Sequence, residues 1–153
     1  MDPGARANRA SKALIKFVKR ILDDAGYTFI ERRKFDTATF LRQPIYTQQY
    51  KVGESIYNRP LTCDFILLHP EKYPDRLIIE CRWQQSRGSV DQKFPYLVRN
   101  IQEKFPCPAI IVLDGSGYNS GAAEWLRNQE DGENLLEVFS MSEFQTWVNN
   151  ENL

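Results

Sequence analysis

Residues 62–83, TCDFILLHPEKYPDRLIIECRW, contain the pattern from which the fold is predicted. Two apolar runs, residues 62–68 and 77–83, flank a polar connection that contains Pro70 and Pro74. Short apolar runs on either side of a proline-containing turn are typical of neighbouring strands. The stretch therefore predicts two adjacent, mostly buried strands at the centre of a sheet.

The hydrophobic spacing outside this pair predicts further helices and strands. Residues 10–25 have a helical period and residues 27–31 suit a strand. After the pair, we expect a helix at 89–105, a strand at 109–113, a helix at 122–128, a strand at 135–139 and a last helix from Ser140, with Glu143 at capping-box spacing. This order indicates an α/β fold with a mixed central sheet flanked by helices. The length suits a single domain over residues 1–153.

The composition excludes several classes of protein. No apolar run reaches the about 18 residues of a membrane span, and no apolar stretch follows the basic N-terminus, so we expect a cytoplasmic protein with no membrane partner. Cys63, Cys81 and Cys107 fit neither a disulfide framework nor a zinc pattern. His69 is the only histidine, which argues against catalytic triads and histidine-based metal sites.

The charge is balanced overall but unevenly placed. Residues 1–60 contain twelve Lys or Arg and six Asp or Glu, whereas residues 61–153 contain eight and fourteen. A basic half indicates a surface that faces a polyanion, although chance clustering of solvated charges explains it equally well. Residues 35–60 are polar and rich in tyrosine and glutamine, which suits a nucleic-acid-facing segment. An antiparallel excursion around Gly53 would explain the same residues without a ligand.

Two carboxylates interrupt the apolar strands and need an explanation, because burying a charge is costly unless it is paired or binds a metal. The two-residue period places Glu80 and Arg82 on one face of their strand. A turn near residue 72 places Asp64 opposite Glu80 or its neighbours, although a slip of one residue would separate them. A buried salt-bridge network is one reading. The other is a site for Mg²⁺, with the carbonyl of Cys81 as a further oxygen ligand.

Four blocks of the sequence, SIYNRPLTCDFIL, LIIECRWQQSRGSVDQKFPYLVRNI, AIIVLDGSGY and VFSMSEFQTW, resemble small phage and bacterial members of the PD-(D/E)XK nuclease superfamily. The resemblance covers roughly residues 8–148. It implies a restriction-endonuclease-like core and a DNA endonuclease that hydrolyses phosphodiester bonds with Mg²⁺, which Mn²⁺ can replace. It also implies that Asp64 and Glu80 bind the metal.

Arg82 stands where the family has a lysine, which is a departure from the motif. Arginine stays protonated, so it can orient and neutralise a phosphate but is a poor base. Three outcomes are open: a metal activates the water without a basic side chain, Lys93 from the following helix replaces the lysine, or the enzyme is slow or inactive. The alternative function is therefore a catalytically weak or inactive DNA-binding or assembly protein of this fold.

Several polar residues are candidate contacts to DNA. Gln92 and Tyr96 form a Gln-x-x-x-Tyr element similar to one in RecB-like nucleases, although a capping glutamine and a core tyrosine explain them equally well. The remaining candidates are Gln84 after the second strand, Lys12 and Lys16 on the first helix, and Arg32, Arg33 and Lys34. Solvated charge is the alternative for the basic residues. Cutting both strands of a duplex needs two active sites, so we expect a homodimer or a larger symmetric assembly.

Overall fold

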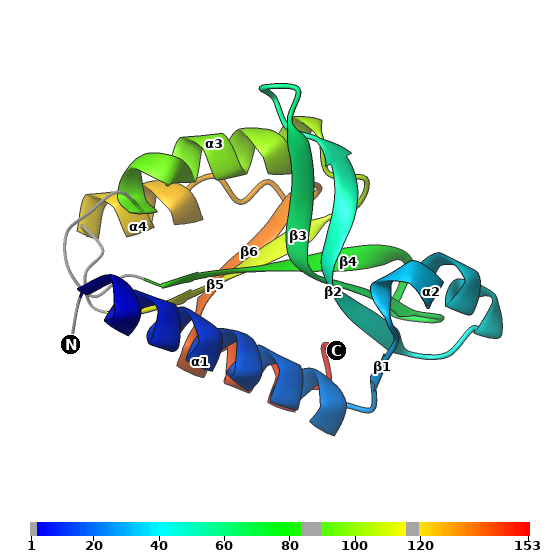
Figure 1. The fold of residues 1–153 in the computed structure, drawn as a ribbon. Helices are drawn as coiled ribbons and strands as arrows, with labels where there is room; N and C mark the ends of the chain where they lie inside the picture. Colours follow the sequence, from blue (N-terminus) through cyan, green and yellow to red (C-terminus); the bar gives the residue numbers. More distant parts are fainter. Residues whose placement is uncertain (1–2, 84–89, 116–119) are drawn as a thin grey trace.

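A computed structural model describes residues 3–83, 90–115 and 120–153. Its sheet contains six strands in the order β1-β2-β3-β4-β5-β6 (Figure 1). The strands are β1 (Thr28–Phe29), β2 (Ile45–Glu54), β3 (Pro60–His69), β4 (Tyr73–Trp83), β5 (Ala109–Asp114) and β6 (Leu135–Ser140). The helices are α1 (Pro3–Asp24), α2 (Arg32–Ala38), the short 3-10 helix η1 (Thr39–Leu41), α3 (Val90–Glu103), α4 (Ser120–Arg127) and α5 (Met141–Asn149).

The predicted pair of strands forms the centre of this sheet. β3 and β4 are antiparallel, with Phe65 opposite Ile79 and Leu67 opposite Leu77. β4, β5 and β6 are parallel to one another, and α3 and α4 make the crossovers between them. The sheet is therefore mixed, and the expected α/β fold with flanking helices is confirmed.

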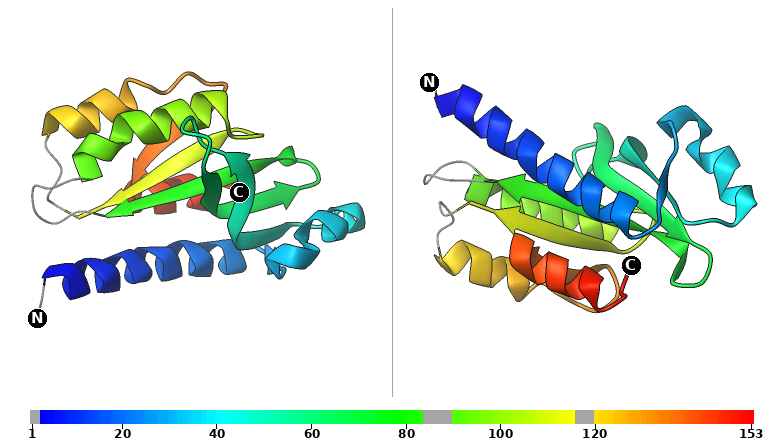
Figure 2. Two further views of the ribbon diagram at one scale, coloured as in Figure 1. Left: turned by 45° about the horizontal axis from the view of Figure 1, so that its top comes forward. Right: turned by 90° about the horizontal axis from the view of Figure 1, so that it is seen from below.

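Helices cover both faces of the sheet. Figure 2 shows α1 and α5 on one face and α3 and α4 on the other. Side chains alternate between the two layers along β4, because successive residues of a strand point to opposite faces. Ile78 packs in the core beneath α3, whereas Ile79 packs in the core against α1. The fully apolar β5 is buried on both faces, as expected of a central parallel strand.

β3 and β4 diverge at one point in the sheet. Their pairing runs as far as Phe65 and Ile79. Beyond it, β3 stays paired with β2 down to its first residue, Pro60, while β4 stays paired with β5 up to Trp83. A register shift between Lys51 and Gly53 marks an irregularity in the β2–β3 pair, whose turn end rises beside α3 (Figure 1). Residues 64 and 80 therefore lie at a fork between two strands.

The structure departs from the sequence predictions mainly before residue 60. The first helix begins at Pro3 rather than at residue 10, and the strand expected at 27–31 is reduced to Thr28–Phe29. Arg32, Arg33 and Lys34 belong to helix α2, which places Phe35 in the core. The antiparallel excursion exists, but its turn lies at residues 55–59, and Gly53 sits at the irregularity with φ of +134°. Tertiary packing of Phe35 explains why local patterns missed α2.

Within the described ranges, no helix is long and apolar enough to cross a membrane.

Candidate functional site

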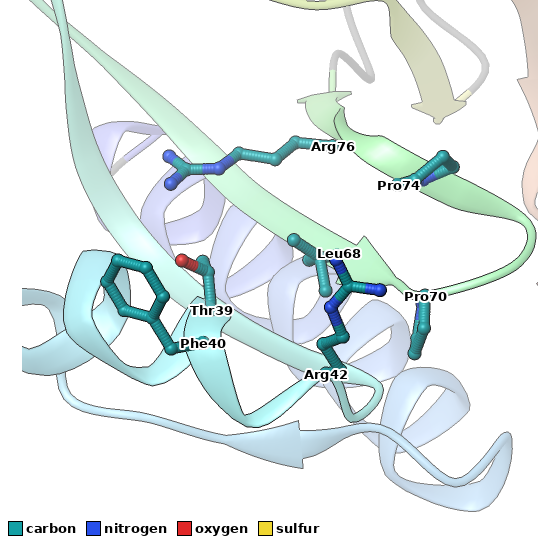
Figure 3. A pocket seen from close by; sticks show the side chains of 7 residues that line it. All are labelled: Thr39, Phe40, Arg42, Leu68, Pro70, Pro74 and Arg76. Atoms are coloured by element: carbon teal, nitrogen blue, oxygen red, sulfur yellow. The ribbon is translucent and has the colours of Figure 1, made fainter.

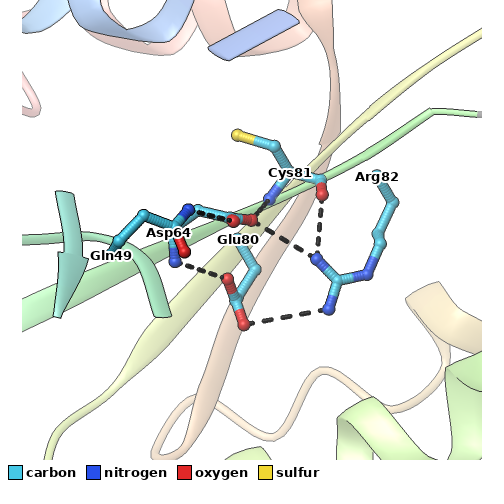
Figure 4. Close-up of polar contacts among 5 residues, drawn as sticks. All are labelled: Gln49, Asp64, Glu80, Cys81 and Arg82. Carbon is cyan, nitrogen blue, oxygen red and sulfur yellow. Dashed lines mark hydrogen bonds and ion pairs between the residues drawn. The ribbon is translucent and has the colours of Figure 1, made fainter. Parts of the chain in front are cut away.

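Asp64 and Glu80 meet at the fork between β3 and β4. The backbone N–H of Asp64 donates to Oε2 of Glu80 at 2.9 Å, and the backbone N–H of Cys81 donates to Oδ2 of Asp64 at 2.8 Å (Figure 4). Each carboxylate thus accepts a backbone N–H of the other strand. This reciprocal pairing holds the two acidic side chains together where the strands part. The prediction that they converge from neighbouring strands is confirmed.

The guanidinium of Arg82 lies among the oxygen atoms of this pair. Its Nη1 is 2.8 Å from the carbonyl oxygen of Cys81 and 3.4 Å from Oδ2 of Asp64, and its Nη2 is 3.8 Å from Oε1 of Glu80. Three oxygen atoms from three residues therefore surround one cationic group (Figure 4). The geometry contains the expected salt-bridge network, and it also shows these oxygens directed at a single positive charge.

The two carboxylates have different environments. The Glu80 side chain is 4% exposed, whereas that of Asp64 is 22% exposed. Burial raises the pKa of Glu80 well above its ordinary value, and the charge of Asp64 raises it further, while the Arg82 guanidinium lowers it. Burial dominates because a carboxylate without water around it loses most of its solvation. Any further cation at these oxygens would relieve this cost.

Glu80 and Arg82 face a small pocket beneath α3. The pocket has a volume of about 150 Å³. Its lining is made of Leu61, Thr62, Glu80, Arg82, Lys93, Tyr96, Leu97, Asn100 and Phe105. Lys93 and Tyr96 are three residues apart on one face of α3, so the helix brings both to the carboxylates. Gln92 is exposed on α3 and does not line this pocket.

Gln49 is a site residue that sequence reasoning did not single out. Its Nε2 donates to Oδ1 of Asp64 at 3.4 Å, and its carbonyl accepts from Nη1 of Arg32 at 3.2 Å. It also has a left-handed backbone with φ of +50°, which is rare for a non-glycine residue inside a strand. The polar composition of residues 35–60 was the only available signal. Through Gln49 the structure links Arg32 to the carboxylates.

The other predicted basic contacts lie farther from the fork. Lys12 and Lys16 are exposed on α1, which covers the face of the sheet opposite Glu80 and Arg82. Arg33 and Lys34 are exposed and lie 3.0 and 4.0 Å from the carboxylate of Glu31. The structure therefore does not bring Lys12 or Lys16 to the carboxylates, whereas Arg33 lines a pocket with Arg32 and Gln49. Gln84 lies outside the described residues.

A larger pocket lies at the other end of the β3–β4 hairpin, near its turn (Figure 3). It has a volume of about 370 Å³ and is lined by Thr39, Phe40, Arg42, Leu68, Pro70, Pro74 and Arg76. Its lining contains no carboxylate, and Arg76 is already paired with Asp36 at 3.0 Å. Size alone therefore does not identify the site, since the acidic groups lie at the fork.

The donor set at the fork fits a hard divalent cation. Two carboxylates and the backbone carbonyl of Cys81 offer oxygen ligands, and Mg²⁺ is usually held by one or two carboxylates with water completing its shell. The guanidinium of Arg82 already draws these oxygens toward one position. In the parts of the chain that the structure describes, no three His, Cys, Asp or Glu residues gather, so a zinc-type site is not formed there.

A comparison with protein families finds a match over nearly the whole chain. A family model for the PD-(D/E)XK nuclease superfamily domain matches residues 6–152. Neither the curated proteins nor the solved structures contain a match. The match covers nearly the whole chain, including both strands of the fork and the helix that follows them.

Proposed function

Because the chain belongs to the PD-(D/E)XK nuclease superfamily, we propose that it is a metal-dependent endonuclease that hydrolyses phosphodiester bonds in DNA. One observation carries the proposal: Asp64, Glu80 and the carbonyl of Cys81 surround a single cationic position at the strand fork. Family membership supports nuclease chemistry and a nucleic-acid partner. The choice of DNA, and of an internal rather than a terminal bond, is part of the proposal.

Asp64, Glu80 and the Cys81 carbonyl would hold Mg²⁺, or Mn²⁺ in its place. When bound, such an ion supplies charge neutralisation at the scissile phosphate and lowers the pKa of the attacking water. The protein residues fix the geometry. The N–H of Asp64 fixes the Glu80 carboxylate, and the N–H of Cys81 fixes the Asp64 carboxylate, so neither acid has to reorganise.

Arg82 would act on the phosphate rather than as a base. Its guanidinium stays protonated, and its forked donors suit phosphate oxygens. The guanidinium of Arg82 and a divalent ion would bind the same oxygen atoms of Asp64, Glu80 and Cys81, so the two cations compete for them. Arg82 would then turn from the carboxylates toward the substrate.

Lys93 would supply the amine that the motif position lacks. It lines the same pocket as Glu80 and Arg82, and its flexible stem can present an ammonium or amine to a phosphate or a water. Among the predicted DNA contacts, we retain Arg32 next to Gln49, and Tyr96 in the pocket. The assignments of Lys12, Lys16, Arg33, Lys34, Gln84 and Gln92 remain predictions.

A second candidate function is DNA binding without useful catalysis. The specific observation behind it is that Arg82, at the position of the family lysine, is engaged with both carboxylates. Buried ion pairs of this kind commonly have a structural role. On this reading the fork is a structural salt bridge and the fold serves recognition or assembly.

Metal-dependent cleavage separates the two functions. Supercoiled plasmid and labelled oligonucleotides would be incubated with Mg²⁺, Mn²⁺ or EDTA, using the wild type, Asp64→Asn and Glu80→Gln. The nuclease proposal expects cleavage by the wild type alone, and only with metal. Intact DNA at high protein concentration, together with retained binding, would instead establish the binding protein.

We also propose that residues 1–153 act as one domain and that cleavage of both strands of a duplex uses two copies, because one site cuts one strand. Light scattering after gel filtration, with and without a duplex, checks the assembly. A protein that makes double-strand breaks as a strict monomer would contradict it.

A further inference from the structure

The turn between β2 and β3 is held in one conformation by a buried serine. Ser55 donates its backbone N–H to the carbonyl of Arg59 at 2.8 Å. Its hydroxyl accepts the N–H of Tyr57 at 3.1 Å, and its carbonyl accepts the N–H of Asn58 at 2.9 Å. Asn58 adopts the left-handed conformation that this turn requires, with φ of +58°. The turn is therefore an internally hydrogen-bonded unit rather than a loose loop.

Two contacts fix this turn onto α3. The N–H of Ile56 donates to Oδ1 of the buried Asn100 at 2.9 Å. The ring of Tyr57 stacks on the ring of Tyr96, with centroids 5.1 Å apart and an interplanar angle of 17°. The position of Tyr57 is thus set relative to α3, which also carries Lys93.

The stacked pair lies beside the carboxylate pocket. Tyr96 lines that pocket together with Glu80 and Arg82. One face of the Tyr57 ring rests on Tyr96, yet the residue is 68% exposed, so its other face is open to solvent. Tyr57 therefore presents an open ring face beside acidic and cationic side chains, where a planar ligand could stack on it.

The other tyrosines of residues 35–60 make their contacts within the protein. Tyr46 is fully buried and its hydroxyl donates to Oδ1 of Asp23 at 2.6 Å. Tyr50 donates to Oδ1 of Asp36 at 2.7 Å and packs on Phe35. Of the three, Tyr57 is the one that offers a ring face to a ligand.

We propose that Tyr57 is a substrate-binding residue on which a nucleobase stacks, next to the phosphodiester bond that is cut. This inference rests on the proposed function and specifies how the substrate is held. Every base has a π-face, so stacking on a tyrosine tolerates any sequence. A turn held by Ser55 and Asn100 lets the base bind without ordering a loop, which preserves affinity. Arg59 in the same turn and Lys93 on α3 are exposed cations suited to the neighbouring phosphates.

The test compares Tyr57→Ala with Tyr57→Phe, which keeps the ring. Phe40→Ala is the matched control, because Phe40 is an 86% exposed aromatic residue that lines the distant pocket (Figure 3). Binding of labelled oligonucleotides would be followed by fluorescence anisotropy with Ca²⁺ replacing Mg²⁺, and gels would verify that the DNA stays intact. We expect Tyr57→Ala to weaken binding about tenfold, within the range for one stacked base. Tyr57→Phe and Phe40→Ala should stay within about twofold of the wild type.

A second measurement locates the stacked base. Oligonucleotides with a single 2-aminopurine at successive positions should show fluorescence quenching at one position in the wild type and in Tyr57→Phe. That quenching should be lost in Tyr57→Ala. If Tyr57→Ala lowers the melting temperature, Tyr57→Leu keeps an apolar contact with Tyr96 without a ring and serves instead.

Distinct outcomes separate this inference from the proposed function. Wild-type binding by a folded Tyr57→Ala or Tyr57→Leu protein overturns the inference while leaving nuclease activity untouched. An equal loss in Phe40→Ala also overturns it, because the effect would then not be local. Quenching that depends on Tyr57 in a protein that never cuts DNA supports base stacking on Tyr57 and refutes the nuclease.

Discussion

Replacing Glu80 by glutamine should stabilise the metal-free protein at mildly alkaline pH. Glu80→Gln keeps the side-chain size and an oxygen that accepts the N–H of Asp64, and it removes a charge from a side chain that is 4% exposed. Burying a charge beside a second carboxylate is costly, and the amide does not carry that cost. A buried charge that lowers stability in this way is typical of a functional site.

The size of the effect follows from the burial of Glu80. Burial, with the charge of Asp64, raises the pKa of Glu80 from 4.5 to about 8. The folded protein therefore holds this proton more tightly than the unfolded chain, so its stability is greatest at low pH and declines as pH rises through that window. Because a pKa difference of one corresponds to about 1.4 kcal/mol, this rise from 4.5 to about 8 sets an upper limit of about 5 kcal/mol. We expect about 2 kcal/mol for Glu80→Gln, because its NH₂ group would face the guanidinium of Arg82.

Thermal and urea unfolding between about pH 5 and about pH 8 in EDTA measure this effect. A gain of about 2 kcal/mol raises the melting temperature by roughly 4–8 °C in a protein of this size. The difference between the wild type and Glu80→Gln isolates the acidic pair at the fork, because groups away from the fork titrate equally in both proteins. Glu71→Gln, an exposed carboxylate in the turn of the same hairpin, is the control and should behave like the wild type. Mg²⁺ or Mn²⁺ should stabilise the wild type most at the higher pH and leave Glu80→Gln unchanged.

Two results would refute this reasoning. Parallel pH curves for the wild type and Glu80→Gln would mean that the Glu80 charge is not costly. A Glu80→Gln protein destabilised by about 3–5 kcal/mol would identify the fork as a structural ion pair, since breaking such a pair has that cost.

Three further predictions concern other residues. Arg82→Ala should bind Mn²⁺ about tenfold more tightly in calorimetry, because the competing guanidinium is gone. The same variant should cut DNA more slowly. Unchanged Mn²⁺ affinity would show that Arg82 does not compete with the metal. Gln49→Gly should raise the free energy of unfolding by up to about 1 kcal/mol, because glycine tolerates the φ of +50°. The same variant should slow cleavage, because it removes the amide that donates to Asp64. Faster cleavage by Gln49→Gly would contradict a supporting role of Gln49 at Asp64. Partial desolvation, together with the side chain of Glu137, raises the pKa of Glu130 to about 7. Wild-type stability should therefore fall slightly as pH rises from about 5 to about 8, and Glu130→Gln should lessen that fall. Identical pH profiles of the melting temperature for the two proteins would contradict this effect of Glu130.

Local sequence patterns were sufficient to predict the central strands and the acidic pair. Apolar runs around a proline-containing turn specify two neighbouring strands locally, and the two-residue period specifies which side chains share a face. Asp64 and Glu80 stood out because charges are rare in such runs. The capping box of Ser140 and Glu143 was also readable, since both of its residues lie in one turn of helix.

The assembly of the site around those acids depends on tertiary packing. Arg32 and Phe35 lie in a helix that local patterns did not show, because packing of Phe35 in the core stabilises it. The stacking of Tyr57 on Tyr96 and the bond from Ile56 to Asn100 join segments about forty residues apart, and no local pattern encodes such contacts. The periodicity of a strand sets the side on which a residue lies. The position at which β3 and β4 diverge decides which oxygen atoms come together. The packing of distant segments sets the position of that divergence.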